Sequence, residues 1–320
     1  MLEPAKNISG DPTSAAQGFG QLGTTPPPAF DPGDDLDAAY EFFENNGFVV
    51  LSSCLNTSEL EHLNGFYDKT QLDSPRAWGI TRKRERHHRQ QGLIFSQPLL
   101  DHPELDRYIQ HPRSFPVVSQ LLGGQHNVRF SEFNFRETPA DAGVGAMNFH
   151  HDRVLPDRLT RTPYMPCDWL CAIHYLTDVT PETPSFCVVP SSSAFESLQE
   201  AFEGLGKNYV ELPLYGAAGT CILYDTAIFH TRLDGDGRHP RRTWHEYFAR
   251  GGWLSTGSGD ARPPTPVLTN WNLFPERLAL HPDPQQRLFF SHWNTAQGEW
   301  VASGFDIDVR RSTARGDVHP

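Results

Sequence analysis

Two histidines and one aspartate are the residues of this 320-residue sequence best suited to hold a metal ion. His150 and Asp152 stand two residues apart in the stretch NFHHDR. On an extended strand, residues at this spacing project from one face, so an imidazole and a carboxylate can reach the same ion. The pattern alone is weak, because polar turns also contain it. Strand alternation turns the adjacent His151 to the opposite face, and whether His151 and Arg153 contact the substrate or only shape the loop stays open.

His230 strengthens the metal hypothesis. It follows the stretch GTCILYDTAIF, about 80 residues after His150, and a jelly roll can bring such a strand back beside the first. Two histidines and one carboxylate form the facial triad of non-heme Fe(II) enzymes, which leaves coordination positions open for a co-substrate and dioxygen. Zinc suits this ligand set less well, since it rarely leaves three positions open.

Arg241 is a candidate for binding an anionic co-substrate. It lies eleven residues after His230, on what we expect to be the next strand. A guanidinium fits a carboxylate with two parallel hydrogen bonds, which suits the distal acid group of 2-oxoglutarate. The adjacent Arg242 would project from the other face, so strand alternation selects one of the two arginines.

The remaining histidines and the cysteines have simpler interpretations. Among the 15 histidines, His174 is expected to be a hydrogen-bonded core residue, whereas the sequence does not decide whether His245 faces the pocket or packs outside. Cys167 and Cys171 resemble half of a zinc site, but no second pair follows. The five scattered cysteines therefore favour reduced thiols, as in the cytoplasm.

Short β-rich runs dominate the chain from residue 127 to 250. They are NVRFSEFNFRE, WLCAIHYLTDV, SFCVVP, NYVELPLY, GTCILYD, AIFH and RTWHEYFAR, separated by Pro, Gly, Asp and Asn. Strands at this spacing, with no helix between each pair, predict an antiparallel sandwich or barrel instead of a βαβ fold. We therefore expect a mostly β fold with flanking helices and a double-stranded β-helix core, the jelly roll of cupin-like proteins.

Helices are predicted before this region. DLDAAYEFFENNGF ends at Asn46-Gly47, a C-cap signal, and FVVLSSCL then forms a short strand. NTSELEHLNGFYDKT opens with a Ser/Thr N-cap and an acidic first turn, and HPELDRYIQHPRSFPVVSQLLG is expected to form one further helix.

The domain organisation follows from these runs. Residues 1–34 are rich in Pro, Gly, Ser and Thr and predict a flexible leader. Residues 35–320 are expected to form a single domain. It comprises a helical part at about 35–125, a jelly-roll core at about 126–252, and a C-terminal segment that packs on the core or forms a lid. The basic stretch TRKRERHHRQQ (81–91) is either a solvated surface or a patch that steers an anionic substrate.

Charge and hydropathy exclude several classes of partner. The formal net charge of −12 argues against broad binding to nucleic acids or anionic membranes, which require a positive surface. No apolar run approaches the roughly 20 residues that cross a bilayer, and the first residues show no targeting pattern. We expect a cytoplasmic protein that acts on a small molecule.

The chain resembles the phytanoyl-CoA dioxygenase-like branch of the Fe(II)/2-oxoglutarate-dependent oxygenases over roughly residues 36–250. Four stretches carry the resemblance in the family's order: EFFENNGFVVLSSCLNTSELEHL, FNFRETP with NFHHD, WLCAIHYLTDVTPETPSFCVVPSSS, and AAGTCILYDTAIFH with HPRRTW. The resemblance implies Fe(II), 2-oxoglutarate and O2 as the cofactor and co-substrates.

The resemblance also assigns roles to individual positions. The implied iron ligands are His150, Asp152 and His230. Arg241 matches the arginine that pairs with 2-oxoglutarate, Asn134 matches a polar residue near that co-substrate, and Trp169 matches an aromatic residue beside the site.

Three departures from the family pattern are visible, and one of them is that the segment beyond about residue 255 shows no family pattern. The usual Gly-Ser-His after the "vvP" strand is Ser191-Ser192-Ser193, which affects a turn more than the chemistry. Arg232 replaces a common small hydroxyl residue two positions after the distal histidine. This change bears on the hydrogen bonding of the co-substrate, or adds a charge at the pocket rim.

Together these features predict oxidation of a small organic molecule, with 2-oxoglutarate converted to succinate and CO2. Asp152 favours hydroxylation, desaturation or rearrangement, because related halogenases replace that carboxylate by a small residue. Two alternatives stay open: a non-catalytic jelly-roll metal-binding protein, and a cupin-type metalloenzyme that does not use 2-oxoglutarate. The candidate substrates are a secondary metabolite and a carboxylated compound, and the sequence does not decide between them. It does not identify the oligomeric state either.

Overall fold

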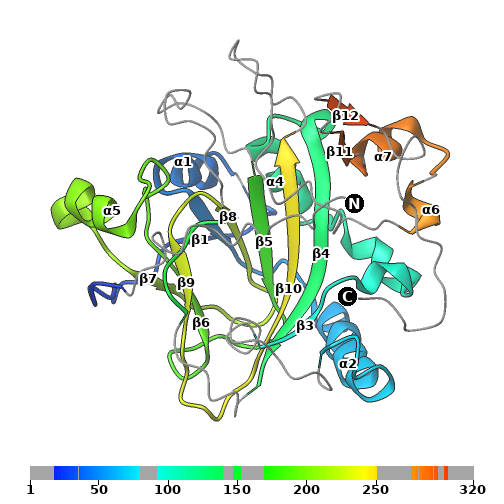
Figure 1. The fold of residues 1–320 in the computed structure, drawn as a ribbon, viewed down its shortest axis with the longest axis horizontal. Coiled ribbons are helices and arrows are strands. Elements are labelled where there is room, and N and C mark those ends of the chain that lie inside the picture. Colours follow the sequence, from blue (N-terminus) through cyan, green and yellow to red (C-terminus); the bar gives the residue numbers. More distant parts are fainter. Residues whose placement is uncertain are drawn as a thin grey trace, which may run out of the picture.

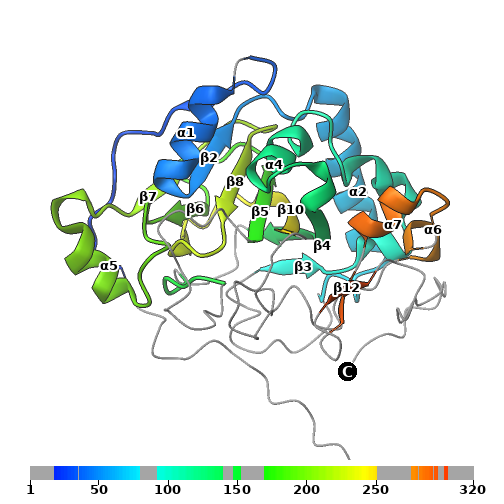
Figure 2. The same ribbon diagram turned by 90° about the horizontal axis from the view of Figure 1, so that it is seen from above.

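The computed structural model describes residues 18–34, 36–79, 92–139, 147–152, 169–250, 275–279, 281–290, 292–294 and 299–301. The basic stretch 81–91 and residues 153–168, including Cys167, lie outside the described residues. Figure 1 shows the long strands β4, β5 and β10 side by side, and Figure 2 shows helices α1, α2 and α4 on one side of them.

The helices carry the labels of Figure 1. They are α1 (Asp37–Asn46), α2 (Thr57–Asp73), α4 (Phe115–Leu121), α5 (Leu198–Leu205), α6 (Glu276–Ala279) and α7 (Pro284–Phe289), with 3₁₀ turns at Pro98–Leu100, Pro103–Tyr108, Gln125–Asn127 and Gly206–Asn208. None of the helices in the described ranges is long and apolar enough to cross a membrane.

The strands form two principal sheets. They are β1 (Ala29–Phe30), β2 (Phe48–Leu51), β3 (Leu93–Phe95), β4 (Val128–Thr138), β5 (Trp169–Tyr175), β6 (Ser185–Val188), β7 (Leu212–Leu214), β8 (Cys221–Asp225), β9 (His230–Leu233), β10 (Arg241–Arg250), β11 (His292–Asn294) and β12 (Glu299–Val301). The larger sheet has the order β1-β2-β8-β5-β10-β4-β3, the smaller one β7-β6-β9, and β11 pairs with β12. All pairs are antiparallel except β1 with β2. The predicted mostly β fold with flanking helices is confirmed.

Side-chain alternation gives the seven-stranded sheet two different faces. Phe133, Phe135 and Trp244 project from the outer face into a core shared with the helices. Residues that alternate with the outward-facing ones along each strand, such as Cys171 on β5 and Tyr247 on β10, project from the inner face into a second core shared with the three-stranded sheet. Apolar burial on both faces stabilises the sheet, at about 25 cal/mol per Å² of apolar surface. Asn134, Trp169 and Arg241 lie on this inner face.

The entry into this sheet follows the predicted helix and strand. α1 ends at Asn46, and Gly47 adopts a left-handed conformation with φ of 79°. The amide of Gly47 donates to the carbonyl of Phe43, and its own carbonyl accepts from the Asp225 amide. The C-cap glycine thus links α1, β2 and the end of β8. The N-cap of α2 was predicted as Ser or Thr, which is wrong. Asn56 caps this helix and forms a capping box with Glu59.

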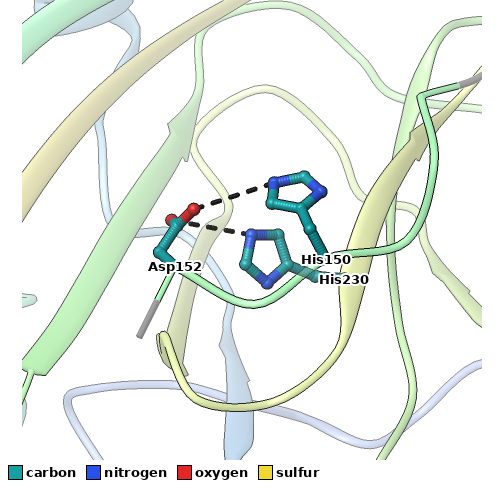
Figure 3. Close-up of side chains that lie close together, drawn as sticks. All are labelled: His150, Asp152 and His230. Carbon is teal, nitrogen blue, oxygen red and sulfur yellow. Dashed lines mark ion pairs between the residues drawn. The ribbon is translucent and has the colours of Figure 1, made fainter. Parts of the chain in front are cut away.

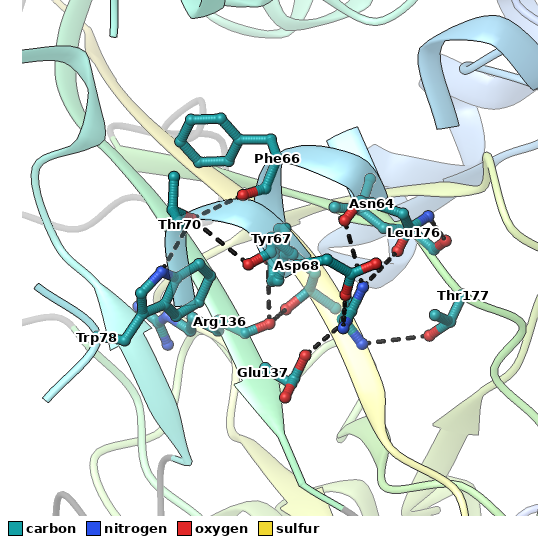
Figure 4. Close-up of polar contacts among 12 residues, drawn as sticks. Asn64, Phe66, Tyr67, Asp68, Thr70, Trp78, Arg136, Glu137, Leu176 and Thr177 are labelled. Atoms are coloured by element: carbon teal, nitrogen blue, oxygen red, sulfur yellow. Dashed lines mark hydrogen bonds and ion pairs between the residues drawn. The ribbon is translucent and has the colours of Figure 1, made fainter. Parts of the chain in front are cut away.

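Helix α2 is fastened to the outer face of β10 by polar contacts (Figure 4). The Tyr67 hydroxyl donates to the carbonyl of Thr243 at 2.5 Å. The Arg242 guanidinium pairs with Asp68 on α2 and with Glu137 on β4, each at 2.6 Å. Since Arg242 is held on the outer face, its neighbour Arg241 must project inward.

Three other predicted elements differ in the structure. The helix expected over 102–123 is divided into the 3₁₀ turn Pro103–Tyr108 and the short helix α4, because Pro112 and Pro116 cannot supply the amides that a continuous helix needs. The run AIFH is a turn up to Phe229, and strand β9 begins at His230. The run NYVELPLY contains only the three-residue strand β7.

Both ends of the described chain contact the sheet. β1 lies within the segment predicted as a leader, and Ser52 donates to the carbonyl of Phe30 beside it. From the C-terminal segment, Phe290 packs edge-on against Phe130 of β4, with ring centres 5.5 Å apart. The single-domain division with a boundary near residue 34 stays a prediction.

Gly47→Ala is expected to lower the free energy of unfolding by about 2–4 kcal/mol. The change places a β-carbon in a left-handed conformation and 2.5 Å from Cγ2 of Ile228. Urea unfolding measures it. Gly65→Ala within α2 is the control, because its β-carbon meets no neighbouring atom. This change is expected to raise the free energy of unfolding by about 0.5–1 kcal/mol. A Gly47→Ala protein as stable as wild type would show that the turn tolerates a side chain there.

Candidate metal and co-substrate site

The structure brings together His150, Asp152 and His230 at one end of the three-stranded sheet (Figure 3). One ligand atom from each residue lies within 4.8 Å of the others. Nε2 of His150 lies 3.7 Å from Oδ1 of Asp152, and Nε2 of His230 lies 3.6 Å from Oδ2. The three donor groups therefore converge, as the binding of one ion requires.

Backbone hydrogen bonds fix this convergence. The His150 amide donates to the carbonyl of His230 at 3.0 Å, and the His230 amide donates back to the carbonyl of His150 at 2.8 Å. The Asp152 amide donates to the carbonyl of Thr226 at 3.0 Å. The two chain segments are thus held in antiparallel register at the site.

Each histidine has one ring nitrogen committed to the backbone. Nδ1 of His150 donates to the carbonyl of Asn148 at 2.9 Å, and Nδ1 of His230 donates to the carbonyl of Ile228 at 3.0 Å. A carbonyl only accepts, so the proton must be on Nδ1 in both rings. Nε2 of each ring is then free of a proton in the neutral histidine and faces Asp152, which is the arrangement of metal-binding histidines.

The protonation states suit a divalent cation. Burial and the neighbouring His230 lower the pKa of His150 to about 4. Burial alone would raise the pKa of Asp152, but the two histidines and Arg136 hold it well below its usual value. At neutral pH the site therefore offers the neutral imidazole of His150 and the ionised carboxylate of Asp152, the forms that bind metal. This nitrogen and oxygen donor set fits Fe(II).

The triad is closed on one side and open on the other. The His230 side chain is 5% exposed, whereas His150 and Asp152 keep 31% and 27% of their surface. His151 contributes nothing to the triad, and its ring packs 5.2 Å from that of Phe229. Molecules that approach the site must therefore do so beside His150 and Asp152.

The serine turn supports the strand that carries His230. Ser192 is fully buried, and its hydroxyl accepts from the amide of Phe229 at 2.8 Å while donating to the carbonyl of Val189 at 2.6 Å. The departure from the family pattern at 191–193 thus lies in a turn that positions the residue before the distal histidine.

Arg241 lies at the start of β10 and projects from the inner face. It is 7% exposed, and its Nε and Nη1 atoms make no hydrogen bond within the described part of the chain. Burial lowers its pKa to about 10. A buried guanidinium with unused donors is costly unless an anion pairs with it. The residue fits a carboxylate-containing co-substrate.

Three hydrogen-bonded polar side chains lie on the inner face of β4, those of Glu132, Asn134 and Arg136. Asn134 was singled out from the sequence, but the other two were not. The Asn134 amide donates to Oε1 of Glu132 at 2.5 Å and accepts from Nε of Arg136 at 2.8 Å. Arg136 also donates to the Tyr247 hydroxyl at 3.1 Å. The run EFNFR carried the signal, because Phe133 and Phe135 occupy the opposite, apolar face. Both polar groups of Asn134 are therefore used within the chain.

Trp169 begins β5 on the inner face, where its ring lies 5.5 Å from that of Tyr247. Its carbonyl accepts from both the amide and the hydroxyl of Thr226, each at 3.1 Å. Thr226 in turn holds Asp152. Trp169 is thus connected through one residue to the candidate carboxylate ligand.

The other residues singled out in the sequence lie apart from the triad. His174 is a buried core residue, as predicted, with its ring stacked 4.0 Å from Trp244. His245 faces inward and shares a hydrogen bond with the Thr243 hydroxyl at 2.9 Å. The four described cysteines are buried and unpaired: Cys54, Cys171, Cys187 and Cys221.

Comparison with known proteins assigns the family. The model of the family described as phytanoyl-CoA dioxygenase (PhyH) matches residues 43–242. The chain belongs to the phytanoyl-CoA dioxygenase family. No match is found among curated proteins.

Solved structures support a phytanoyl-CoA dioxygenase fold. The non-heme alpha ketoglutarate dependent carbocyclase SnoK from nogalamycin biosynthesis is 16% identical with a TM-score of 0.55, over 70% of this chain and 88% of its own. EctD from S. alaskensis with bound Fe is 18% identical with a TM-score of 0.54, over 75% and 82%. The epimerase SnoN, in complex with Fe3+ and alpha ketoglutarate, is 16% identical with a TM-score of 0.52, over 68% and 84%. These are jelly-roll enzymes, so the predicted core is confirmed. In the described part of this chain, the two sheets do not close into a barrel.

The adjacent arginines give opposite predictions for stability. Arg241→Met is expected to raise the free energy of unfolding of the ligand-free protein by about 1–3 kcal/mol, because it removes a buried charge that has no partner among the described residues. Arg242→Met is the control and is expected to lower it by about 1–3 kcal/mol, because it leaves Glu137 and Asp68 without their partner. Chemical denaturation measures both. Equal losses in the two variants would contradict the unpaired state of Arg241.

Proposed function

We propose that this protein is an Fe(II)- and 2-oxoglutarate-dependent dioxygenase that oxidises a small organic molecule, with release of succinate and CO2. The observation that carries the proposal is the pairing of two features. Three metal-binding side chains converge at the three-stranded sheet with their ligand atoms within 4.8 Å, and a buried arginine without a described partner projects from the inner face of the seven-stranded sheet. A structural metal site would require the first feature but not the second.

The proposed metal ligands are His150, Asp152 and His230. Their task is to hold the ion with imidazole Nε2 atoms and a carboxylate whose positions are set by the backbone. Iron held there would supply the oxygen chemistry. The open side of the triad, beside His150 and Asp152, leaves room for the co-substrate and the substrate.

The proposed co-substrate residues are Arg241, Asn134 and Trp169. Arg241 would pair with the distal carboxylate of 2-oxoglutarate, since Nε and Nη1 of its buried guanidinium donate no hydrogen bond within the described part of the chain. Asn134 lies on the same inner face as Arg241, where it orients Arg136, and Trp169 would provide an apolar wall. Arg232 is also buried and lies within electrostatic range of Arg241. It adds positive charge where relatives carry a small hydroxyl residue.

Asp152 favours hydroxylation, desaturation or rearrangement as the outcome. The structural neighbours include a carbocyclase and an epimerase by their descriptions, so enzymes of this fold differ in the outcome of their reactions. We further propose a cytoplasmic setting and a small-molecule substrate of the secondary-metabolite type, with no nucleic-acid or membrane partner.

Asp152→Ala tests the metal assignment. With Fe(II), 2-oxoglutarate and O2, we expect succinate formation to fall by about 100-fold or more, because removal of a ligand should exceed the 10–100-fold effects of outer-shell changes. His151→Ala is the matched control, since its ring packs on Phe229 outside the triad, and it should stay within a few-fold of wild type. Equal succinate release by wild type and Asp152→Ala would sink the proposal.

Arg241→Ala tests the use of 2-oxoglutarate. We expect the KM for 2-oxoglutarate to rise about 100-fold, as for loss of one partner from a buried charge pair. The visible charge-transfer band that forms on anaerobic addition of Fe(II) and 2-oxoglutarate should need correspondingly more co-substrate. Arg238→Ala, at an exposed residue nearby, is the control. An unchanged KM would point instead to a metalloenzyme that does not use 2-oxoglutarate. Absence of the band in wild type would favour a non-catalytic metal-binding protein.

A further inference from the structure

Glu132 is an acidic residue on the inner face that the proposed chemistry does not use. It lies on β4 between the outward residues of the apolar core, so its carboxylate points inward with those of Asn134 and Arg136. It lies deep in the protein, yet it is not fully covered. The same combination of depth and remaining exposure marks Asp152, a proposed metal ligand.

Sheet register places Glu132 at the level of the triad. Glu132 is opposite Tyr247 on β10, Tyr247 is opposite Cys171 on β5, and Cys171 is opposite Tyr224 on β8. The Tyr224 ring meets the His230 ring edge-on at 5.0 Å. One crosswise row of the sheet therefore joins a metal-binding histidine at one end to Glu132 at the other. The charges of Glu132 and Asp152 lie within electrostatic range of one another.

One oxygen of Glu132 has no partner in the described part of the chain. Oε1 accepts from the Asn134 amide at 2.5 Å. Oε2 makes no hydrogen bond or ion pair with a described residue, although Arg136 is close enough to attract it electrostatically. Arg136 instead donates to Asn134 and Tyr247. Asn134 therefore fixes the carboxylate through Oε1, while Oε2 is available to accept a hydrogen bond from a ligand.

We propose that Glu132 anchors the substrate of this enzyme by accepting a hydrogen bond from a protonated amine. The inference rests on the proposed function, since it needs a substrate beside the metal site. An ammonium group is the partner that best satisfies a buried carboxylate with one unused oxygen, because charge-assisted hydrogen bonds are about twice as strong as neutral ones. Burial raises the pKa of Glu132, and a bound cation would favour its ionised form again.

The substrate class that follows is a small amine. The carboxylate on β4 would hold its charged end, while the carbon to be oxidised faces the triad at the other end of the crosswise row. A carboxylated substrate, which the sequence left open, would meet Glu132 as a like charge. Arg136 is already engaged electrostatically with Glu132 and by hydrogen bonds with Asn134 and Tyr247, and Arg241 is proposed to hold 2-oxoglutarate.

The test compares matched probes on wild type and three variants. The probes are cyclohexylamine, cyclohexanol and cyclohexanecarboxylate, and benzylamine, benzyl alcohol and benzoate. Binding is followed anaerobically by the perturbation of the Fe(II)–2-oxoglutarate band, and separately by the thermal shift of the metal-free protein. The variants are Glu132→Gln, Glu132→Asp and the control Glu246→Gln. Glu246 is a buried carboxyl on the outer face of the same sheet, where burial keeps its pKa well above the usual value.

Wild type and Glu246→Gln should bind at least one amine about 10-fold or more tightly than its matched alcohol, which corresponds to one charge-assisted hydrogen bond. Glu132→Gln should reduce that preference to near unity. Glu132→Asp should keep the preference with several-fold weaker amine binding, and it tests the proposal even if Glu132→Gln does not fold.

Three results would overturn the proposal: no amine preference in wild type, a preference for carboxylates, or an amine affinity that neither Glu132 variant changes. Failure of the proposed function has a different signature, because the band would then be missing in wild type before any probe is added. The thermal shift of the metal-free protein would still report whether Glu132 selects amines.

Discussion

The candidate site depends on one short antiparallel contact, the pair of backbone hydrogen bonds between His150 and His230. Strand β9 begins at the distal histidine, so its first residue is already held in register by β6 and by the segment before Asp152. The Asp152 amide then bonds to Thr226. With the backbone fixed on both sides, the side chains need little further ordering before they bind an ion, which limits the entropic cost of binding.

Strand alternation separates the roles of neighbouring residues. On β10, Arg242 is neutralised on the outer face by Asp68 and Glu137, whereas Arg241 is buried inward without a described partner. On β4, phenylalanines pack outward while Glu132, Asn134 and Arg136 project inward. The outward residues of each strand stabilise the fold, and the inward residues can bind ligands. A shift of register by one residue would exchange the two sets.

Some features followed from sequence because they depend on local rules. The Asn46-Gly47 turn, the spacing of His150 and Asp152, and the choice between Arg241 and Arg242 rest on capping and alternation, which are properties of a few adjacent residues. Other features depend on what the strands pack against. A charged residue such as Glu132 in an alternating strand is normally solvent-facing, and nothing local shows that this face is enclosed by a second sheet. The division of residues 102–123 follows from a local rule as well, because Pro112 and Pro116 have no amide to donate within a continuous helix.

The origin of the three ligands in two distant segments has a thermodynamic consequence. His150 and Asp152 lie about 80 residues before His230, so an ion bound by all three acts as a reversible cross-link that closes a long loop. Any ion that binds only this folded arrangement must stabilise it in proportion to its affinity and concentration. Metal supply would then govern the lifetime of the folded edge as well as turnover, and a cell short of the metal would hold a more protease-sensitive form of the same chain.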